Sequence, residues 1–287
     1  MTTAIWIALI FLSIFFIYTL SKDFFAHRKV LEDVSVLKTA IIGFVVNFFD
    51  VLGIGAFAPQ TALLKFTKQT EDRLLPGTLN VANTVPVLIQ ALIFIQIVEV
   101  ESLTLLAMLL SAMAGAVFGA GRVAKMPVRR IQIIMGFALL VTAFFMLSGQ
   151  MNWIQGGGEA IGLSGWKLAV AVGVNFILGA FMTVGIGLYA PCMALVYALG
   201  MSPLVAFPIM MVSCAFLMPP ASAKFIKEGA YNRKAAVAMA IPGAIAVLIA
   251  AYIVKSLPLD TLRWVVIGVI VYTSVVMFRS AQQQSQT

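Results

Sequence analysis

Asp50 stands out for its chemistry, because it is the only acidic residue within an apolar segment of the sequence. It lies three residues before Gly53, and Asn47 stands one helical turn earlier on the same face. An ionisable side chain in such surroundings is costly and is a functional hypothesis by default. We hypothesise that Asp50 exchanges protons. The alternative is a neutral acid or a cap that hydrogen-bonds to the neighbouring chain break.

Two similar glycine-containing runs predict interrupted helices. They are VLGIGAFAP at 51–59 and TVGIGLYAP at 183–191, and both contain Gly-Ile-Gly and then Ala-Pro. Glycine permits unusual backbone dihedral angles, and proline suits the first turn of a helix. Each run is therefore expected to end one helix, turn tightly and begin a short helix at Pro59 or Pro191. The glycines concerned are Gly53, Gly55, Gly185 and Gly187.

The two short helices would form an anion site if their starts face each other. A helix N-terminus carries roughly half a positive charge and free N–H groups, so two of them can bind an anion without Arg or Lys. The recurrence of the break in both halves of the chain favours this interpretation. The alternative is that both breaks are kinks required only for packing.

Further polar residues within apolar segments are candidates for the same site. Asn80 and Asn83 are expected to line a pathway, whereas Gln90 is expected to bond helices together. Hydroxyl groups beside the second break could donate hydrogen bonds to an oxyanion. These are the hydroxyls of Thr183 and Tyr189, and Ser213 is a further candidate at the depth in the second half that corresponds to Asn80 and Asn83.

Neither a metal nor a cofactor is expected from the sequence. Cys192 and Cys214, the two cysteines, lie inside apolar segments and show no metal-ligand spacing. The apolar segments contain no histidine and no pair of base and nucleophile, which argues against an enzyme.

The composition predicts that these residues are positioned by helices in lipid. Hydrophobic residues make up 62% of the 287 positions and charged residues 10%, with a mean hydropathy of +1.04. A soluble domain carries roughly 25% charged residues, so water cannot be the solvent for this much apolar surface. The basic residues, which give a net charge of +8, lie in short loops. That placement is typical of membrane proteins, and no nucleic-acid partner is expected.

Apolar segments divide the chain into a leading helix and two blocks. The leading segment, 3–20, precedes a polar loop at 21–35 and is expected to be a retained spanning helix rather than a signal peptide. Each block contains a long segment that breaks at its glycine run, a short piece and three full-length helices. The expected pieces are 36–52, 59–66, 76–98, 102–122 and 130–148, then 165–184, 191–199, 204–226, 234–254 and 261–279.

The two blocks match each other at a nearly constant offset. The glycine runs align at an offset of 132, and Ala107-Met108 and Pro127 match Ala238-Met239 and Pro258 at 131. We therefore predict an internal duplication. The expected divisions are a leading helix and cytoplasmic loop at 1–35, repeat 1 at 36–149, an external linker at 150–164 and repeat 2 at 165–287.

The distribution of positive charge predicts that the repeats are inverted. If each short piece returns as a re-entrant hairpin to the side of entry, each repeat crosses the membrane three times. With the N-terminus outside and the C-terminus in the cytoplasm, sixteen Lys and Arg residues face the cytoplasm and three face out. If each long segment and its short piece formed one continuous crossing, ten Lys and Arg residues would face one side and nine the other. The positive-inside rule therefore favours the hairpins. The expected fold class is an all-α integral membrane protein of the plasma (inner) membrane, with a leading helix and two inverted repeats.

The glycine runs and the duplicated arrangement resemble the sulfite exporter TauE/SafE-like permeases, also described as the toluene sulfonate uptake permease family. The resemblance covers about 36–280 and implies a permease with two repeats, each opening with a glycine-rich run. Here the runs continue with Ala56-Phe57 and Leu188-Tyr189 instead of more glycine. The family is associated with sulfur-containing anions such as sulfite, thiosulfate and sulfonates. The matching glycines are Gly53, Gly55, Gly185 and Gly187.

The residues and the resemblance together predict a secondary transporter that moves a small anion by alternating access, with protons as a candidate coupling ion. Sulfite or another organosulfur anion is the substrate that the resemblance implies. Cys192, directly after Pro191, could touch such a substrate, and a small apolar filler is the alternative. Two other functions remain open, a cation/proton antiporter that uses Asp50 and a membrane assembly factor that transports nothing.

Overall fold

The computed structural model describes residues 2–51, 54–94, 100–153, 158–185, 187–253 and 260–283. Within these ranges the chain is all-helical, and no strand forms apart from an isolated bridge between Ala160 and Met201. The helices, in chain order, are α1 (Thr2–His27), α2 (Val36–Val51), α3 (Phe57–Phe66), α4 (Leu75–Phe94), α5 (Ser102–Val123), α6 (Val128–Gln150), α7 (Gly165–Met182), α8 (Tyr189–Ala198), α9 (Pro203–Lys227), α10 (Arg233–Ile253) and α11 (Asp260–Gln283).

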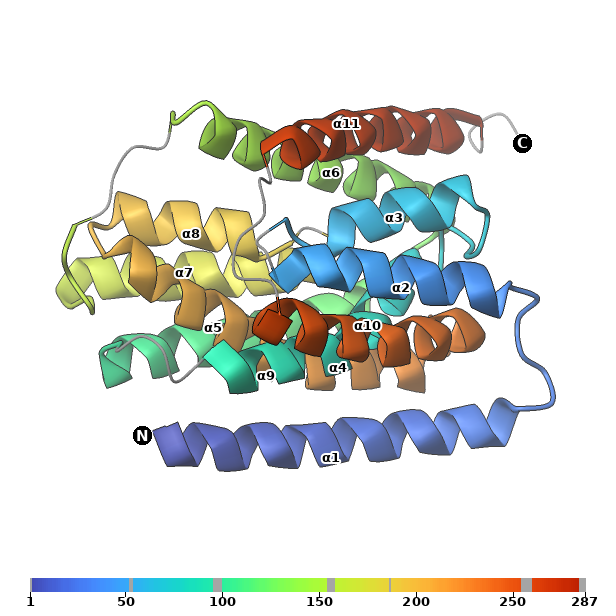
Figure 1. Ribbon diagram of the computed structural model, residues 1–287, viewed down its shortest axis with the longest axis horizontal. Coiled ribbons are helices and arrows are strands. Elements are labelled where there is room, and N and C mark those ends of the chain that lie inside the picture. The colour runs from blue at the N-terminus through green and yellow to red at the C-terminus, as the bar shows by residue number, and fades with distance from the viewer. Residues whose placement is uncertain are drawn as a thin grey trace.

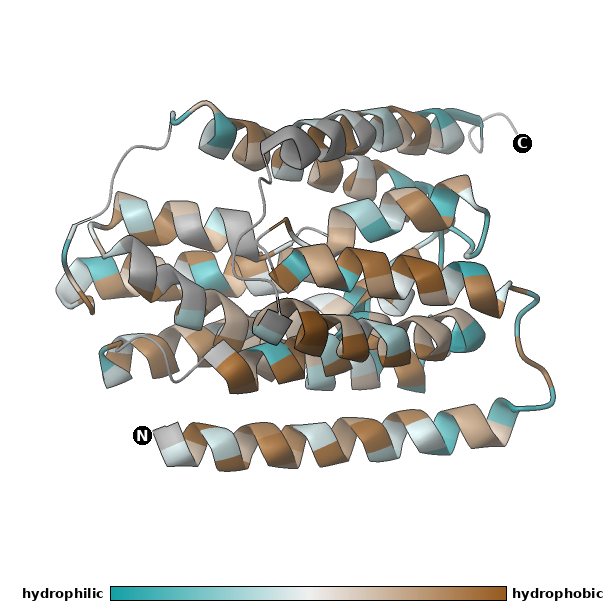
Figure 2. Ribbon diagram, viewed as in Figure 1, coloured by the Kyte–Doolittle hydropathy of each residue, from teal (hydrophilic) through white to brown (hydrophobic). Residues whose placement is uncertain are grey.

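The length and composition of the helices make the chain a multi-pass membrane protein. Among the described residues, six helices are long and apolar enough to cross a bilayer, and they lie in α1, α5, α6, α7, α9 and α10. On α1, the large apolar side chains of Ile7, Phe11, Ile14 and Tyr18 are all more than half exposed. Figure 2 shows hydrophobic residues along the length of α1, where lipid rather than water is the suitable solvent.

Helices from the two halves of the chain pack against each other. Helix α2 packs on α10, α5 packs on α7 and α9, α4 packs on α9 and α10, and α6 packs on α11. In Figure 1, α6 and α11 lie along one edge of the bundle and α1 lies along the opposite edge. The sites of closest approach are glycines. A Cβ atom on Gly43 of α2 would lie 2.4 Å from the carbonyl oxygen of Met239, and one on Gly179 of α7 would lie 2.1 Å from that of Ala112.

The leading helix is longer than its sequence predicted. The polar loop was expected from Ser21, but α1 continues to His27. Its last turns are held by a cluster in which Arg233 Nε and the Tyr231 hydroxyl each donate to Asp23 Oδ2 at 2.7 Å. These contacts outweigh the polarity that favours a loop at this point.

The same cluster ties the connection between α1 and α2 to the start of α10. The Glu32 carboxylate accepts hydrogen bonds from the backbone N–H groups of Arg233 and Lys234, at 3.1 and 3.2 Å. These N–H groups lie in the first turn of α10 and have no carbonyl partner within the helix. A negative charge is favourable at such a helix N-terminus. Burial and the hydrogen bond to Asp23 raise the pKa of Tyr231, so its hydroxyl stays a donor at neutral pH.

The two short helices begin two residues earlier than predicted. They start at Phe57 and Tyr189, so Pro59 and Pro191 occupy the third helical position instead of the first. Proline is tolerated there because the first turn has no intrahelical partner for its N–H groups.

Candidate functional site

Both predicted breaks interrupt a helix, and each requires glycine. Gly55 has a φ of +87° between α2 and α3, and Gly185 has a φ of +114° between α7 and α8. Side chains disfavour this left-handed region, whereas glycine enters it freely. Gly187 lies in the second break, and Gly53 lies outside the described residues. Figure 1 shows α3 and α8 in opposite halves of the bundle, with the breaks that precede them facing the middle.

The two short helices present N-termini that no N-cap side chain satisfies. Ala56 is the N-cap residue of α3 and Leu188 is that of α8, and neither makes a side-chain cap hydrogen bond. Each helix has ten residues, so its first turn carries the partial positive charge of a helix N-terminus. These ends can attract a negative group.

Asp50 lies at the first of these ends. Its side chain is 3% exposed, and its carboxylate interacts with the backbone N–H of Ala56, at the start of α3. Gln90 Nε2 of α4 donates to Asp50 Oδ2 at 2.7 Å. Gln90 was expected to bond helices together, and it does so through the acid itself. In this conformation a carboxylate therefore occupies the position at α3 that an anion would take.

Asn80 and Asn83 of α4 contact residues of both breaks. Asn80 Nδ2 lies 3.4 Å from the carbonyl oxygen of Thr183, the C-cap residue of α7. Asn83 Nδ2 donates to Gln60 Oε1, on the first turns of α3. One face of α4 therefore connects the end of α7 with the start of α3. All of these polar side chains are buried.

Gln60 is a site residue that the sequence reasoning missed. Its side chain is fully buried, and its Nε2 also lies 3.2 Å from Met239 Sδ of α10. The signal that could have found it is its position directly after Pro59, in the first turns of the short helix. At the offset of 132, its counterpart in the second half is Cys192.

The second half places sulfur where the first half places amides and a carboxylate. Asp50 aligns with Met182 at 132, and Cys214 of α9 lies at about the depth of Asn83 in the second half. Cys214 Sγ lies 3.8 Å from Met182 Sδ, and Cys214 is within electrostatic range of both Asp50 and Cys192. The site therefore has a polar flank from α2, α3 and α4 and a sulfur-rich flank from α7, α8 and α9.

The remaining predicted residues divide between the site and its surroundings. Thr183 is buried beside the second break, and its hydroxyl donates to the carbonyl oxygen of Ala180 at 2.6 Å. Asn47 is not hydrogen-bonded to Asp50: its Nδ2 donates to the carbonyl oxygen of Gly43 at 2.9 Å, and its Oδ1 has no hydrogen-bond partner among the described residues. Ser213 is buried on α9 without a partner for its hydroxyl among the described residues. Tyr189 begins α8.

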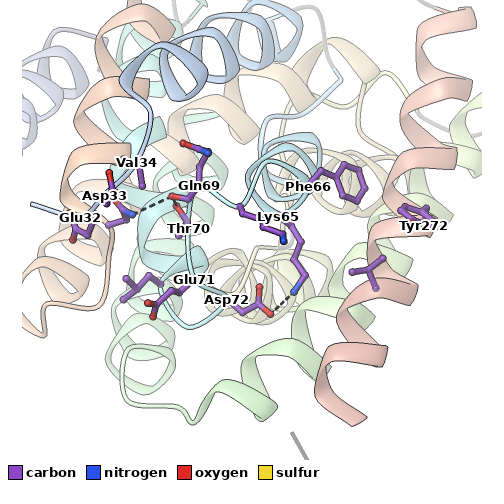
Figure 3. A pocket seen from close by; sticks show the side chains of 14 residues that line it. Glu32, Asp33, Val34, Lys65, Phe66, Gln69, Thr70, Glu71, Asp72 and Tyr272 are labelled. Carbon is purple, nitrogen blue, oxygen red and sulfur yellow. Dashed lines mark hydrogen bonds and ion pairs between the residues drawn. The ribbon is translucent and has the colours of Figure 1, made fainter. Parts of the chain in front are cut away.

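A cavity of about 730 Å³ lies away from the breaks, at the far end of α3. Figure 3 shows Lys65, in the last turn of α3, reaching Asp72 of the following loop, and their charged atoms are 2.5 Å apart. Lys65 Nζ also lies 3.2 Å from Ser280 Oγ of α11, and Gln132 of α6 donates to Asp72 at 2.7 Å. The polar groups of this cavity therefore hold α3 to α6 and α11.

Comparison with known proteins finds a similarity in the second half of the chain. Residues 167–287 match the family model described as Sulfite exporter TauE/SafE. No curated protein and no solved structure matches the chain. The match supports the resemblance that the glycine runs carry, because it contains α8 and all the helices that follow it.

Proposed function

We propose that this TauE/SafE-like membrane protein is a secondary transporter that moves a small anion by alternating access. The observation that carries the proposal is the pair of breaks, each followed by a short helix whose N-cap residue makes no side-chain cap bond, with buried side chains of α4 in contact with the end of α7 and the start of α3. Broken helices of this kind form the substrate sites of many transporters, with helix N-termini directed at anionic groups.

The asymmetry of the two breaks favours the start of α8 as the anion site. At α3 the carboxylate of Asp50 already interacts with the first backbone N–H, whereas the aligned residue before α8 is the uncharged Met182. Protonation of Asp50 would remove the negative charge from the start of α3 and make that end attractive to the anion as well. Proton binding and anion binding would then favour each other, which is the requirement for coupling.

Sulfite or another organosulfur anion is the substrate we propose, from the description of the matching family. The sulfur-rich flank of Met182, Cys192 and Cys214 is compatible with a polarisable, sulfur-containing ligand. Cys192 is fully buried in the first turn of α8, next to the proposed anion site.

Flux measurements test this function directly. The purified chain, reconstituted in proteoliposomes, is expected to transport at least one of sulfite, thiosulfate and sulfoacetate, with a rate that depends on an imposed pH gradient. Chloride and sodium serve as comparison ions. Movement of cations alone, with no selectivity among anions, would contradict the proposal and favour the cation/proton antiporter.

We further propose that the two halves are inverted repeats, with the N-terminus outside the plasma membrane and the C-terminus in the cytoplasm. The packing pairs support this arrangement. Helix α2 of the first half packs on α10 of the second, and their counterparts α7 and α5 pack on each other in the same way. Such reciprocal pairs are expected of two repeats related by a two-fold axis.

Cysteine labelling distinguishes inverted repeats from continuous crossings. In a chain that carries Cys192→Ala and Cys214→Ala, single Glu101→Cys and Lys227→Cys variants are expected to react from opposite sides with a membrane-impermeant maleimide. Both positions are exposed next to helix ends, so access should not limit the reaction. If each long and short piece formed one continuous crossing, both cysteines would react from the same side.

A further inference from the structure

Three buried asparagines of α2 and α4 have side-chain oxygens without a hydrogen-bond donor. Asn80 and Asn83 are fully buried, and each turns its NH₂ group to a carbonyl oxygen four residues earlier in α4, at 2.8 Å. Asn47 of α2 does the same at 2.9 Å. Among the described residues, the side-chain carbonyl oxygens of all three asparagines have no hydrogen-bond partner. A buried polar atom without a partner is costly, so a bound ion or a water would stabilise these oxygens.

Proline adds main-chain acceptors at the same place. Pro86 of α4 and Pro219 of α9 have no N–H group, so the carbonyl groups of Ala82 and Ala215 lack their helical donors. Ala82 directly precedes Asn83, and both alanines are fully buried. Helices α4 and α9 pack together, and the hydroxyl oxygens of Thr84 and Ser222 lie 2.9 Å apart across their contact.

The end of α7 meets the same face of α4 through the donor side of Asn80. The carbonyl oxygen of Thr183, the C-cap residue of α7, lies 3.4 Å from Asn80 Nδ2. The carbonyl oxygens of Phe181 and Met182 accept from the backbone N–H groups of Val184 and Gly185, at 3.0 Å each. The end of α7 is therefore paired, and the Asn80 oxygen is left without a partner, with Asn83 one turn further along α4.

We propose that α4 holds a small monovalent cation of about the size of sodium, bound by the side-chain oxygens of Asn80 and Asn83. Oxygen is the ligand that hard cations prefer. The oxygens come from neutral groups, whereas divalent cations usually take carboxylates. The proposal deepens the proposed function, on which it rests for the role of the cation, because Asn80 contacts Thr183 beside the second break and a cation there would stabilise an anion at the start of α8.

A cation-dependent thermal shift of the full chain tests the site. In detergent at constant ionic strength, replacing choline chloride with sodium chloride is expected to raise the Tm of the wild-type protein in a saturable manner. In Asn80→Ala and Asn83→Ala, the sodium concentration at the midpoint of this Tm shift is expected to rise by at least about tenfold, a loss of about 1.4 kcal/mol of binding free energy. Binding of radioactive sodium to the wild-type protein is a second measurement, and it does not depend on any variant.

Asn175→Ala is the matched control. Asn175 is a fully buried asparagine of α7 whose side-chain oxygen also lacks a partner, but its Nδ2 donates to Met108 of α5 at 2.7 Å, in a different helix contact. This variant is expected to keep the sodium shift even if its Tm in choline is lower. An equal Tm of the wild type in sodium and choline, or equal loss of the shift in Asn175→Ala and Asn80→Ala, would overturn the proposal and leave water as the partner of these oxygens.

Flux separates failure of this inference from failure of the proposed function. Anion transport that is independent of a sodium gradient, in a protein without a sodium shift, would reject the cation site and leave anion transport intact. Sodium binding by a protein that moves none of the anions would retain the site and reject the proposed function.

Discussion

Asp50→Asn is expected to abolish the response of anion flux to a pH gradient while leaving the protein folded. Asparagine keeps the size of the side chain, can still accept a hydrogen bond from Gln90, and is as good as aspartate at the start of a helix. It cannot bind or release a proton. A difference of one unit in the pKa of Asp50 between the two access states corresponds to about a tenfold change in their populations. A stimulation of flux by the pH gradient of about this size should therefore disappear in the variant. Flux in proteoliposomes with and without a pH gradient measures the effect.

Asp72→Asn is the control for this prediction. Asp72 is a half-buried carboxylate that pairs with Lys65 at the far end of α3, away from the breaks. Its replacement is expected to leave the pH response in place. The thiol of Cys214 is within electrostatic range of Asp50, and Cys214→Ala should also keep the response. A pH response retained by Asp50→Asn would assign Asp50 to the capping role alone.

Gly179→Ala is expected to destabilise the protein by about 1–3 kcal/mol or more, as overpacked contacts do. An added Cβ would lie 2.1 Å from the carbonyl oxygen of Ala112 in α5, and a main-chain atom cannot move aside as a side chain can. The helices α5 and α7 would have to separate. A lower Tm in detergent and a smaller yield of monodisperse protein are the measurements.

Gly173→Ala on the same helix provides the matched control, because a Cβ at Gly173 meets nothing within 4 Å. That change is expected to be neutral or slightly stabilising, since alanine is the better helix former. Gly43→Ala should reproduce the loss at the reciprocal contact of α2 with α10, where the nearest atom is the Met239 carbonyl oxygen at 2.4 Å. Equal Tm values for Gly179→Ala and Gly173→Ala would show that α5 and α7 do not need this close approach.

The two halves differ at residues that are expected to work together. Asp50 and Gln60 in the first half correspond to Met182 and Cys192 in the second. A duplicated fold that keeps both breaks but changes the side chains around them can assign proton exchange to one half and anion binding to the other. The proposed transporter uses this difference, with Asp50 at the start of α3 and the anion at the start of α8.

Most of the local structure could be predicted from the sequence, because it depends on local physical chemistry. The apolar segments have the length of spanning helices, and the predicted bounds of α2, α5 and α7 agree with the structure to within two residues. The breaks follow from the glycines, of which Gly55 and Gly185 have backbone angles that other residues disfavour. The largest departure is α1, whose extension to His27 depends on Asp23 meeting Arg233, 210 residues away in the sequence, and α11 also continues four residues past its predicted end, to Gln283.

The partners within the site were decided only by the tertiary structure. Asp50 was recognisable as an isolated acid, but its contact with Gln90 depends on how α2 and α4 are rotated and how far each has shifted along the other. In soluble proteins an apolar stripe fixes that rotation, whereas these helices are apolar on nearly every face, so hydropathy does not indicate which side meets a neighbour. The contacts of Asn80 with Thr183 and of Asn83 with Gln60 arise from this packing. The sequence therefore determined that the helices break and that an acid stands beside one break, and the packing of glycine-lined helices determined which polar groups gather there.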